Sequence, residues 1–206
     1  MIDYKKTQKE LYLPKTTPSV IDVPRMTFIT VDGKGNPNTS DEYAAAVELL
    51  YGLSYVIKMG SKSILEYVVP PLEGLWSVDD DFKGGGAAIN DKSKFIWTMM
   101  IRQADFVTED ILETAKISLA KKKPNLDISK AKLETITEGI CVQVMHIGSY
   151  DDEPATVAKL DGFAIQNGYV LDINEIRRHH EIYISDPRKV AAEKLKTVLR
   201  HPISKA

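Results

Sequence analysis

Apolar and polar residues alternate with a period of two near the C-terminal end of the chain, between positions 179 and 185. This alternation predicts a half-buried β-strand. Successive side chains of a strand point to opposite faces, so that one face holds His179, Glu181 and Tyr183, and the other holds His180, Ile182 and Ile184. The two isoleucines require a covering helix. A carboxylate beside a phenol in the middle of a strand indicates either a solvated surface or a functional site.

The pattern before this strand predicts a first structural unit. Its elements are, in order, a strand at 25–31, a capped helix at 39–60, strand segments at 64–69 and 73–78, a strand at 94–101 and a helix from 108 to 123. A proline-broken arm of residues 1–24, with a short helical piece at 8–13, precedes the unit. The segments at 73–78 and 94–101 predict an antiparallel hairpin, whose long loop has a flexible tip at glycines 84–86.

A second unit repeats this order. It contains a strand at 139–147, a glycine-bearing loop, a helix that opens near Pro154 and ends at Gly168, and strands at 169–172 and 178–185. The dipeptide Asp186-Pro187 is typical of the start of a following helix. We therefore predict one domain over residues 1–206, with a first half at about 25–124, a connector at about 125–138 and a second half at about 139–206. A short element at 129–133 is expected inside the connector.

One such unit leaves a face of its sheet bare, so two copies must close together. We predict an α+β fold of duplicated β-α-β-β halves related by a pseudo-two-fold axis. Its antiparallel sheets meet through their open faces, the helices lie outside, and a ligand cleft lies at the centre. When the last predicted strands of the halves are laid side by side, the residues that face this cleft are Trp97, Met99, Glu181 and Tyr183.

Composition and charge exclude several classes of function. The net charge of −2 argues against sequence-independent nucleic-acid binding. The single cysteine, Cys141, excludes an internal disulfide and a cysteine-based zinc cluster, and it favours a reducing compartment. No apolar run approaches the roughly 20 residues of a membrane span, and the N-terminus has no apolar signal core. We expect a cytoplasmic protein with no direct nucleic-acid or membrane partner. His179 and His180 point to opposite faces, so no metal site is expected.

Four stretches of the sequence resemble the GyrI-like small-molecule-binding family, which also provides the effector domains of some multidrug regulators of the MerR and AraC types. They are residues 14–38, 70–76, 145–155 and 181–187, of which the last two are the more specific. The resemblance implies a duplicated β-α-β-β fold and an aromatic cleft around one buried glutamate, which falls on Glu181. For the stand-alone relatives it also implies hydrolysis of cyclopropane-bearing genotoxins of the yatakemycin and duocarmycin kind. No helix-turn-helix segment is recognised ahead of this domain, so a regulator role would need a separate partner.

The implied reaction defines the groups that the site must supply. Water attacks a ring carbon while negative charge moves onto a carbonyl oxygen, which becomes a phenol. The site must position water, take its proton and donate a hydrogen bond to the carbonyl. Glu181 is the candidate base and Tyr183 the candidate donor. The alternative for Glu181 is a solvated carboxylate paired with Arg177 or Arg178.

Five further residues are candidates for substrate binding. Trp76 and Trp97 can sandwich a flat aromatic ligand, and Met99 and Met145 suit a pocket that adapts to several ligands. His146 can orient a catalytic water. The alternative for the tryptophans and methionines is ordinary core packing, and for His146 a structural role with both ring nitrogens satisfied.

Three functions therefore stay open. The first is a hydrolase that needs no cofactor and uses Glu181 to assist water. The second is a non-catalytic protein that sequesters planar, often cationic drugs against Glu181. The third is a protein-interaction role like that of gyrase-inhibiting relatives. A planar aromatic small molecule is the expected partner in the first two. The sequence leaves the oligomeric state open and is compatible with a monomer.

Overall fold

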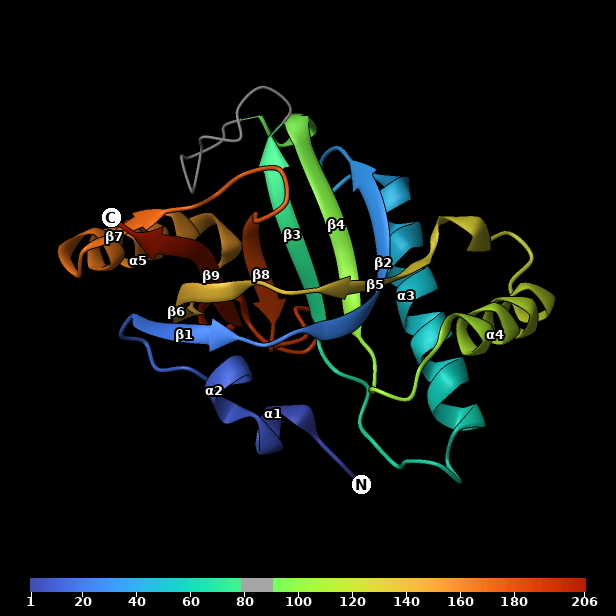
Figure 1. Cartoon of the computed structure of the whole chain (residues 1–206). Helices are drawn as coiled ribbons and strands as arrows, with labels where there is room; N and C mark the ends of the chain where they lie inside the picture. The colour runs from blue at the N-terminus through green and yellow to red at the C-terminus, as the bar shows by residue number, and fades with distance from the viewer. Residues whose placement is uncertain (79–90) are drawn as a thin grey trace.

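A computed structural model describes residues 1–78 and 91–206, so the glycines expected at a hairpin tip (84–86) lie outside the described residues. Within the described part, nine strands form one antiparallel sheet (Figure 1). The strands are β1 (Ser19–Val23), β2 (Met26–Lys34), β3 (Leu72–Val78), β4 (Phe95–Arg102), β5 (Lys132–Ile136), β6 (Gly139–Ile147), β7 (Tyr169–Leu171), β8 (His179–Tyr183) and β9 (Lys196–Lys205). The α-helices are α1 (Tyr4–Thr7), α2 (Lys9–Tyr12), α3 (Asp41–Gly60), α4 (Glu109–Lys122) and α5 (Glu153–Gln166). Short 3-10 turns are η1 (Lys92–Lys94), η2 (Ile128–Lys130), η3 (Tyr150–Asp152) and η4 (Ala192–Lys194).

The strand order confirms the predicted α+β fold of duplicated halves. From the centre outward, β3, β4 and β2 follow one another on one side, and β8, β9 and β6 on the other. The central strands β3 and β8 pair with each other, so the halves join edge to edge in one sheet, and not through their faces as expected. A strand from outside each half forms the edge of the sheet. The strand β1, from the N-terminal arm, pairs with β6 of the second half, and β5, from the connector, pairs with β2 of the first half.

Three predicted elements differ from those observed. Residues 64–69 form only an isolated bridge, between Tyr67 and Ile2, ahead of Pro70-Pro71. The segment 178–185 is not the last strand of its half, since β9 follows it and inserts between β8 and β6. The helix expected after Pro187 is absent from the described residues, where η4 leads directly to β9.

Polar caps and prolines define where the longer helices begin. Ser40 caps α3 by accepting a hydrogen bond from the backbone N–H of Tyr43, one residue later than the predicted Thr39. Thr108 caps α4 in the predicted manner. Pro154 occupies the first turn of α5, and Gly168 follows the helix with a φ of 79°, a left-handed conformation that favours glycine.

The sheet carries a hydrophobic core on each face. The helix α3 packs its leucines Leu49, Leu50 and Leu53 against β2 and β4, and α4 packs on α3, while α5 covers β6 and β9 (Figure 1). On the opposite face Ile182 of β8 packs with residues of the N-terminal arm and α2, among them Tyr12. A short helix and its arm therefore cover the isoleucine face that we expected a longer helix to cover.

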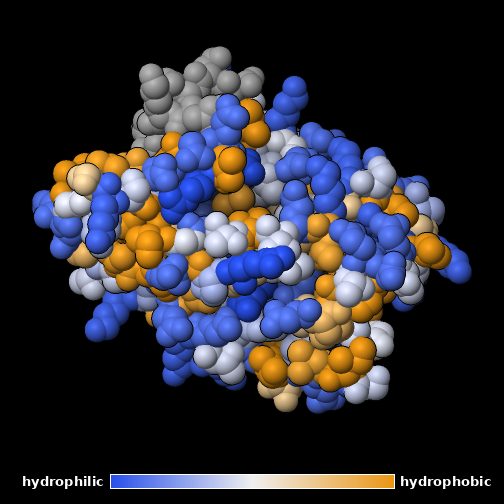
Figure 2. All heavy atoms as spheres, viewed as in Figure 1, coloured by the Kyte–Doolittle hydropathy of each residue, from blue (hydrophilic) through white to orange (hydrophobic). Residues whose placement is uncertain are grey.

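One face of the molecule carries a mixed surface. Figure 2 shows hydrophilic residues over much of the face seen in Figure 1, with hydrophobic residues in smaller groups between them. Among the described residues, the helices all fall short of the length and apolar character that crossing a bilayer requires.

Candidate active site

Glu181 lies in the middle of β8, where the two halves of the sheet meet. Its cross-strand neighbours are Gly74 on β3 and Leu199 on β9. The side chain of Glu181 is 15% exposed. Its Oε1 lies 3.0 Å from Nε2 of His179, and its Oε2 accepts a hydrogen bond of 2.7 Å from the hydroxyl of Tyr183. The period-two pattern thus placed three residues of β8 on one face, where they form a connected polar site.

The two arginines considered as partners of Glu181 are engaged elsewhere. Arg177 donates to the carbonyl oxygens of Glu138 and Ile140 and pairs with Asp172. Arg178 donates to the hydroxyl of Thr98 at 2.6 Å. Neither arginine is recorded in contact with Glu181 in the described part of the chain, so the carboxylate is not part of a surface ion pair.

A second carboxyl group, Glu153, faces Glu181 from the first residue of α5. Glu153 is 7% exposed, and Glu181 and Thr197 of β9 lie close enough to act on its pKa through hydrogen bonding. Glu153 is not recognisable as a site residue from the sequence alone, because a glutamate in the first turn of a helix is usually a solvated residue that complements the helix dipole. The only earlier signal was its place inside the stretch 145–155 that carries the family resemblance.

The two carboxyl groups hold opposite protonation states. Burial, and then the nearby charge of Glu181, raise the pKa of Glu153 well above its ordinary value of 4.5. Burial also acts to raise the pKa of Glu181, but hydrogen bonds from His179, Tyr183 and Glu153 outweigh it and lower that pKa. The opposite shifts favour one proton between the two carboxyl groups, held by Glu153, and leave Glu181 as the ionised acceptor. Such a pair is a common arrangement for acid–base chemistry.

Tyr183 connects Glu181 to a tryptophan. The indole N–H of Trp76 donates to the Tyr183 hydroxyl at 3.0 Å, and that hydroxyl donates onward to Glu181. Burial and the neighbouring Glu181 charge raise the pKa of Tyr183 well above its ordinary value, so the side chain stays a neutral phenol. Its proton is engaged by Glu181, which makes Tyr183 an orienting group rather than a free donor.

Two other phenols, Tyr150 and Tyr43, lie in the same site. The Tyr150 ring meets the Tyr183 ring edge to face, with centroids 5.9 Å apart. Burial, followed by the charges of Glu153 and Glu181, raises the pKa of Tyr150 to about 12. The pKa of Tyr43 is raised by burial and by Glu181. No hydrogen bond of either hydroxyl is recorded among the described residues, so both phenols are available as donors. Tyr150 lies in the stretch 145–155, but neither phenol was among the residues predicted for the site.

Trp97 and Met99 share the face of Glu181, as predicted, but both are fully buried. The Trp97 ring lies directly over Gly33, where an added Cβ would come within 2.1 Å of the ring, and it meets Tyr43 edge to face at 5.3 Å. A ligand therefore cannot stack on Trp97 without displacing core side chains. Trp76 is half-buried and lies beside Tyr43 and Phe95, which leaves it as the accessible indole of this site.

Gly74 explains how Trp76 comes so close to Glu181. It pairs with Glu181 across the β3–β8 ladder, and a Cβ at this position would lie 2.7 Å from Nε1 of Trp76 and 3.1 Å from Sδ of Met99. The missing side chain lets the indole lie across β3 and reach Tyr183.

Met145 and His146 are not brought into this cluster. Met145 points to the opposite face of β6, where it packs with residues such as Leu75 and Ile182, because adjacent residues of a strand alternate between faces. His146 shares the face of Glu181, but its Nδ1 lies 2.8 Å from the Thr156 hydroxyl and its Nε2 lies 2.9 Å from the carbonyl oxygen of Ser149. Both ring nitrogens are thus engaged in holding the turn before α5, and His146 has the structural role considered as the alternative.

On the other face of the sheet, His180 belongs to a buried charge cluster. Its ring nitrogens lie 3.0 Å from Glu73 and 3.0 Å from Glu138, and Arg200 pairs with Glu138 at 2.8 Å. Burial acts to lower the pKa of His180, but the two carboxylates outweigh it and raise that pKa to about 9. This cluster connects β3, β8 and β9 behind the site. Among the described residues, no group of three or more histidine, cysteine, aspartate or glutamate side chains is arranged to hold a metal ion.

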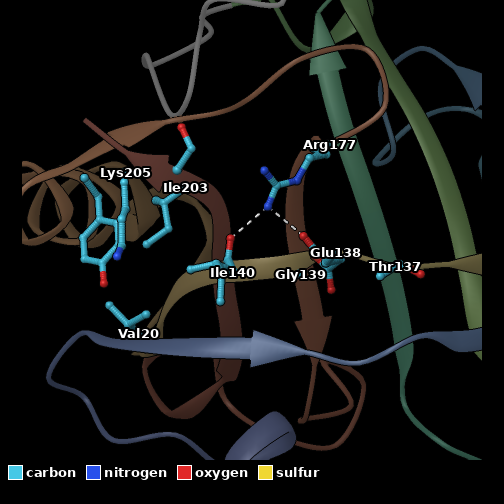
Figure 3. A pocket seen from close by; sticks show the side chains of 10 residues that line it. Val20, Thr137, Glu138, Gly139, Ile140, Arg177, Ile203 and Lys205 are labelled. Atoms are coloured by element: carbon cyan, nitrogen blue, oxygen red, sulfur yellow. Dashed lines mark hydrogen bonds between the residues drawn. The ribbon is translucent and has the colours of Figure 1, made fainter.

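Two recorded cavities lie away from Glu181. One, of about 460 Å³, is lined by residues such as Val20, Ile140 and Ile203, and Arg177 crosses it to reach two backbone carbonyls (Figure 3). The other, of about 310 Å³, is lined by residues of β5 and by Arg178. The guanidinium of Arg177 is already engaged by its hydrogen bonds, and neither of these two cavities holds a pair of carboxyl groups like Glu181 and Glu153. We therefore place the candidate site at Glu181, because of this carboxyl pair.

Comparison with known families finds one match. The GyrI-like small molecule binding domain matches residues 16–204, which is nearly the whole chain. Among curated proteins, no relative matches the chain.

Several solved structures are similar along their full length. An uncharacterized conserved protein from Listeria innocua is 46% identical, with a TM-score of 0.92 and coverage of 99% of this chain and 100% of that one. A structure named as a hydrolase from the same organism is 45% identical, with a TM-score of 0.88 and coverage of 99% and 100%. A further Listeria innocua hydrolase is 46% identical, with a TM-score of 0.87 and coverage of 98% and 99%.

Proposed function

The chain belongs to the GyrI-like small-molecule-binding family, and from this membership and the carboxyl pair we propose that it is a cytoplasmic hydrolase that needs no cofactor. Its substrates are planar aromatic electrophiles with a cyclopropane ring fused to a dienone, like genotoxins of the yatakemycin and duocarmycin kind. Opening the ring removes the electrophile and protects the cell. Two relatives, at 45% and 46% identity, carry the name hydrolase, which supports the reaction class.

The observation that carries the proposal is an ionised carboxylate held next to a neutral carboxylic acid and beside aromatic rings. Glu181 keeps its negative charge although its side chain is only 15% exposed, because three groups donate hydrogen bonds to it. Such a carboxylate can accept a proton from water. Glu153 retains a proton that it can share. A solely structural role would not require two carboxyl groups in opposite states at one point.

In the proposed reaction the atoms and charges balance as the addition of one water. The oxygen of water forms a bond to a cyclopropane carbon while Glu181 takes one of its protons. The strained C–C bond breaks, its electron pair moves through the ring system, and the carbonyl oxygen gains the negative charge. Tyr150 is the donor that we assign to this oxygen, because its hydroxyl has no recorded partner and its raised pKa of about 12 keeps it a phenol. The resulting phenolate then takes up a proton, so no redox partner is required.

Substrate binding is assigned to Trp76. Its indole is half-buried, and its N–H already holds Tyr183 in position. Stacking a planar ligand on this ring supplies contact area at low entropic cost. It also covers Glu181 and excludes bulk water from the reacting atoms.

The second candidate is a binding protein that does not turn its ligand over. The same ionised carboxylate beside Trp76 favours a planar cation, through charge and cation–π attraction. In that case Glu181 neutralises the ligand charge and performs no proton transfer.

Incubation of the purified protein with a duocarmycin-type compound separates the two. A hydrolase yields a product heavier by one water, and the yield rises with time beyond one equivalent of protein. Quenched tryptophan emission with an unchanged ligand mass would leave only the binding role. Glu109 begins α4 as Glu153 begins α5, but it is exposed to solvent. Glu109→Gln is therefore the control for substitutions of the buried carboxyl pair. This variant retains full turnover.

A further inference from the structure

A series of hydrogen-bonded side chains leads from Glu181 along the same face of the sheet to helix α5. Nε2 of His179 lies 3.0 Å from Glu181, and Nδ1 of His179 lies 2.6 Å from Nε2 of His201 on β9. Nδ1 of His201 lies in turn 2.6 Å from Oδ1 of Asp161 on α5. The four side chains come from three elements that the fold brings together, and each contact is within hydrogen-bond distance.

The two ends of this hydrogen-bonded chain lie on different elements. Glu181 faces the candidate site and Asp161 lies on helix α5, and their side chains are similarly exposed, at 15% and 17%. His201 between them is fully buried, and the His179 side chain is 14% exposed. The chain therefore connects a group that a bound ligand would cover to one that keeps its own access to solvent.

Counting protons shows what this chain can do. Three hydrogen bonds in series require three bridging protons, but two neutral imidazoles supply only two. The series Glu181, His179, His201 and Asp161 thus has room for one additional proton when both carboxyl groups are ionised. An imidazole takes up a proton at one ring nitrogen and releases another from the opposite nitrogen, so the additional proton can enter at one end and leave at the other.

The groups around the rings favour such transfer. Burial, and then the nearby His179, lower the pKa of His201, while Asp161 acts in the opposite direction. A ring that is neutral at rest can accept a proton and pass it on. The other titratable groups at the Glu181 end are Glu153 from α5, Tyr183 from β8, Tyr150 from η3 and Tyr43 from α3, and burial raises the pKa of each.

We propose that His179, His201 and Asp161 form a proton-transfer chain that returns Glu181 to its ionised form after each turnover. At rest each ring carries its proton on Nε2, and His179 donates to ionised Glu181. Once Glu181 has taken a proton from water, the two rings change to their Nδ1–H tautomers, so that Nε2 of His179 can accept that proton. The Nδ1 proton of His179 then moves to Nε2 of His201, and the Nδ1 proton of His201 moves to Asp161 and on to solvent, which restores the Nε2–H tautomers. The two histidines and Asp161 are positioning and proton-transfer residues that act through Glu181. This assignment rests on the proposed hydrolase activity.

The first test needs no substrate. The chain has only four histidines, so ¹⁵N-histidine NMR can assign each ring. Asp161→Asn keeps the side-chain size but cannot accept a proton. It is expected to change the ring-nitrogen shifts and the titration of His201 and also of His179, which Asp161 does not touch. A change confined to His201, with His179 unaltered, would overturn the coupling. Asp32→Asn, a partly exposed carboxylate on the opposite face that pairs with Lys132, is the control and leaves both rings unchanged.

The second test measures turnover of the duocarmycin-type compound. Asp161→Asn and His201→Asn are each expected to lower kcat about tenfold or more with KM nearly unchanged, as for impaired proton transfer. Added imidazole buffer should restore kcat in a concentration-dependent manner, which it does not do for wild type. Wild-type kcat in Asp161→Asn, or a loss that buffer does not restore, would contradict the relay. Failure of the hydrolase proposal gives a different result: no turnover in any variant, with the NMR coupling intact.

Discussion

Replacement of Glu153 by glutamine should stabilise the protein at neutral pH, and increasingly so as the pH rises. The native state holds Glu153 protonated, because burial and the facing Glu181 raise its pKa well above 4.5. Glutamine is nearly the same size and carries N–H groups in place of the carboxylic O–H, so it can donate to Glu181 without titrating. The substitution therefore retains the geometry. It also removes the free-energy cost of keeping the Glu153 carboxyl protonated in the native state at a pH where the unfolded chain would ionise it.

The sign and size follow from linkage. Below about pH 4.5 the carboxyl group is protonated in both the folded and the unfolded chain, and its contribution to stability is fully present. Above this pH the unfolded chain releases the proton while the native state retains it, so the free energy of unfolding of the wild type falls by about 1.4 kcal/mol per pH unit until the pH passes the folded pKa. The advantage of Glu153→Gln should therefore grow as the pH rises above about 4.5, by at most about 1.4 kcal/mol per pH unit.

Urea denaturation of wild type and Glu153→Gln at several pH values between 5 and 8 measures this difference. The exposed control Glu109→Gln should differ from wild type by less than about 0.5 kcal/mol throughout. If the advantage of Glu153→Gln stays flat with pH, or if the variant becomes less stable as the pH rises, then Glu153 is ionised in the native protein. The assignment of acid and base in this site would then be wrong.

Four further substitutions test other parts of the site. Glu181→Gln should lower turnover about a hundredfold or more while ligand affinity stays within about tenfold, and equal losses in both would make Glu181 a binding anchor instead. Gly74→Ala should lower the free energy of unfolding, measured by urea denaturation, by about 1–3 kcal/mol and weaken ligand binding, because the added Cβ would lie 2.7 Å from Nε1 of Trp76. Wild-type stability and affinity in this variant would show that the indole need not lie there. Trp97→Phe should lower the free energy of unfolding by about 1–3 kcal/mol yet retain ligand-induced fluorescence quenching. Trp76→Phe should abolish the quenching at little cost in stability. The reverse pattern would place the ligand on Trp97.

Local patterns in the sequence were sufficient for much of the fold. The alternation at 179–183 predicted both the strand β8 and the face shared by Glu181 and Tyr183, because the period of a strand depends only on backbone geometry. Capping residues and the positions of Pro154 and Gly168 similarly located the helices to within a residue or two. The duplicated order of elements was visible as well, and it is what the strand order of the sheet reproduces.

The strand β9 was not predicted, because some of its residues are unusual for a central strand. The strand β9 lies near the centre of the sheet, but it contains Pro202 and the charged residue Arg200, which in sequence argue against a central strand. The proline is tolerated beside Cys141 of β6, and Arg200 is neutralised by Glu138 from a distant segment. Without β9, His201 had no position, and the chain from Glu181 to Asp161 could not be anticipated.

The protonation states of the carboxyl groups could not be predicted from the sequence, because they also depend on contacts between distant segments. Nothing local distinguishes Glu153 from an ordinary glutamate at a helix start, since its raised pKa depends on burial against β8. The exposure of the two tryptophans was equally undetermined: both carry the same apolar pattern, but α3 and Tyr43 cover Trp97 and leave Trp76 half-buried.

The most direct test is a crystal structure of the Glu181→Gln variant with an intact duocarmycin-type compound bound. The account predicts the ligand plane against Trp76, a cyclopropane carbon facing the substituted side chain at position 181, and the carbonyl oxygen within hydrogen-bond distance of the Tyr150 hydroxyl. A ligand seated instead in the cavity crossed by Arg177, with the face around position 181 unoccupied, would contradict it.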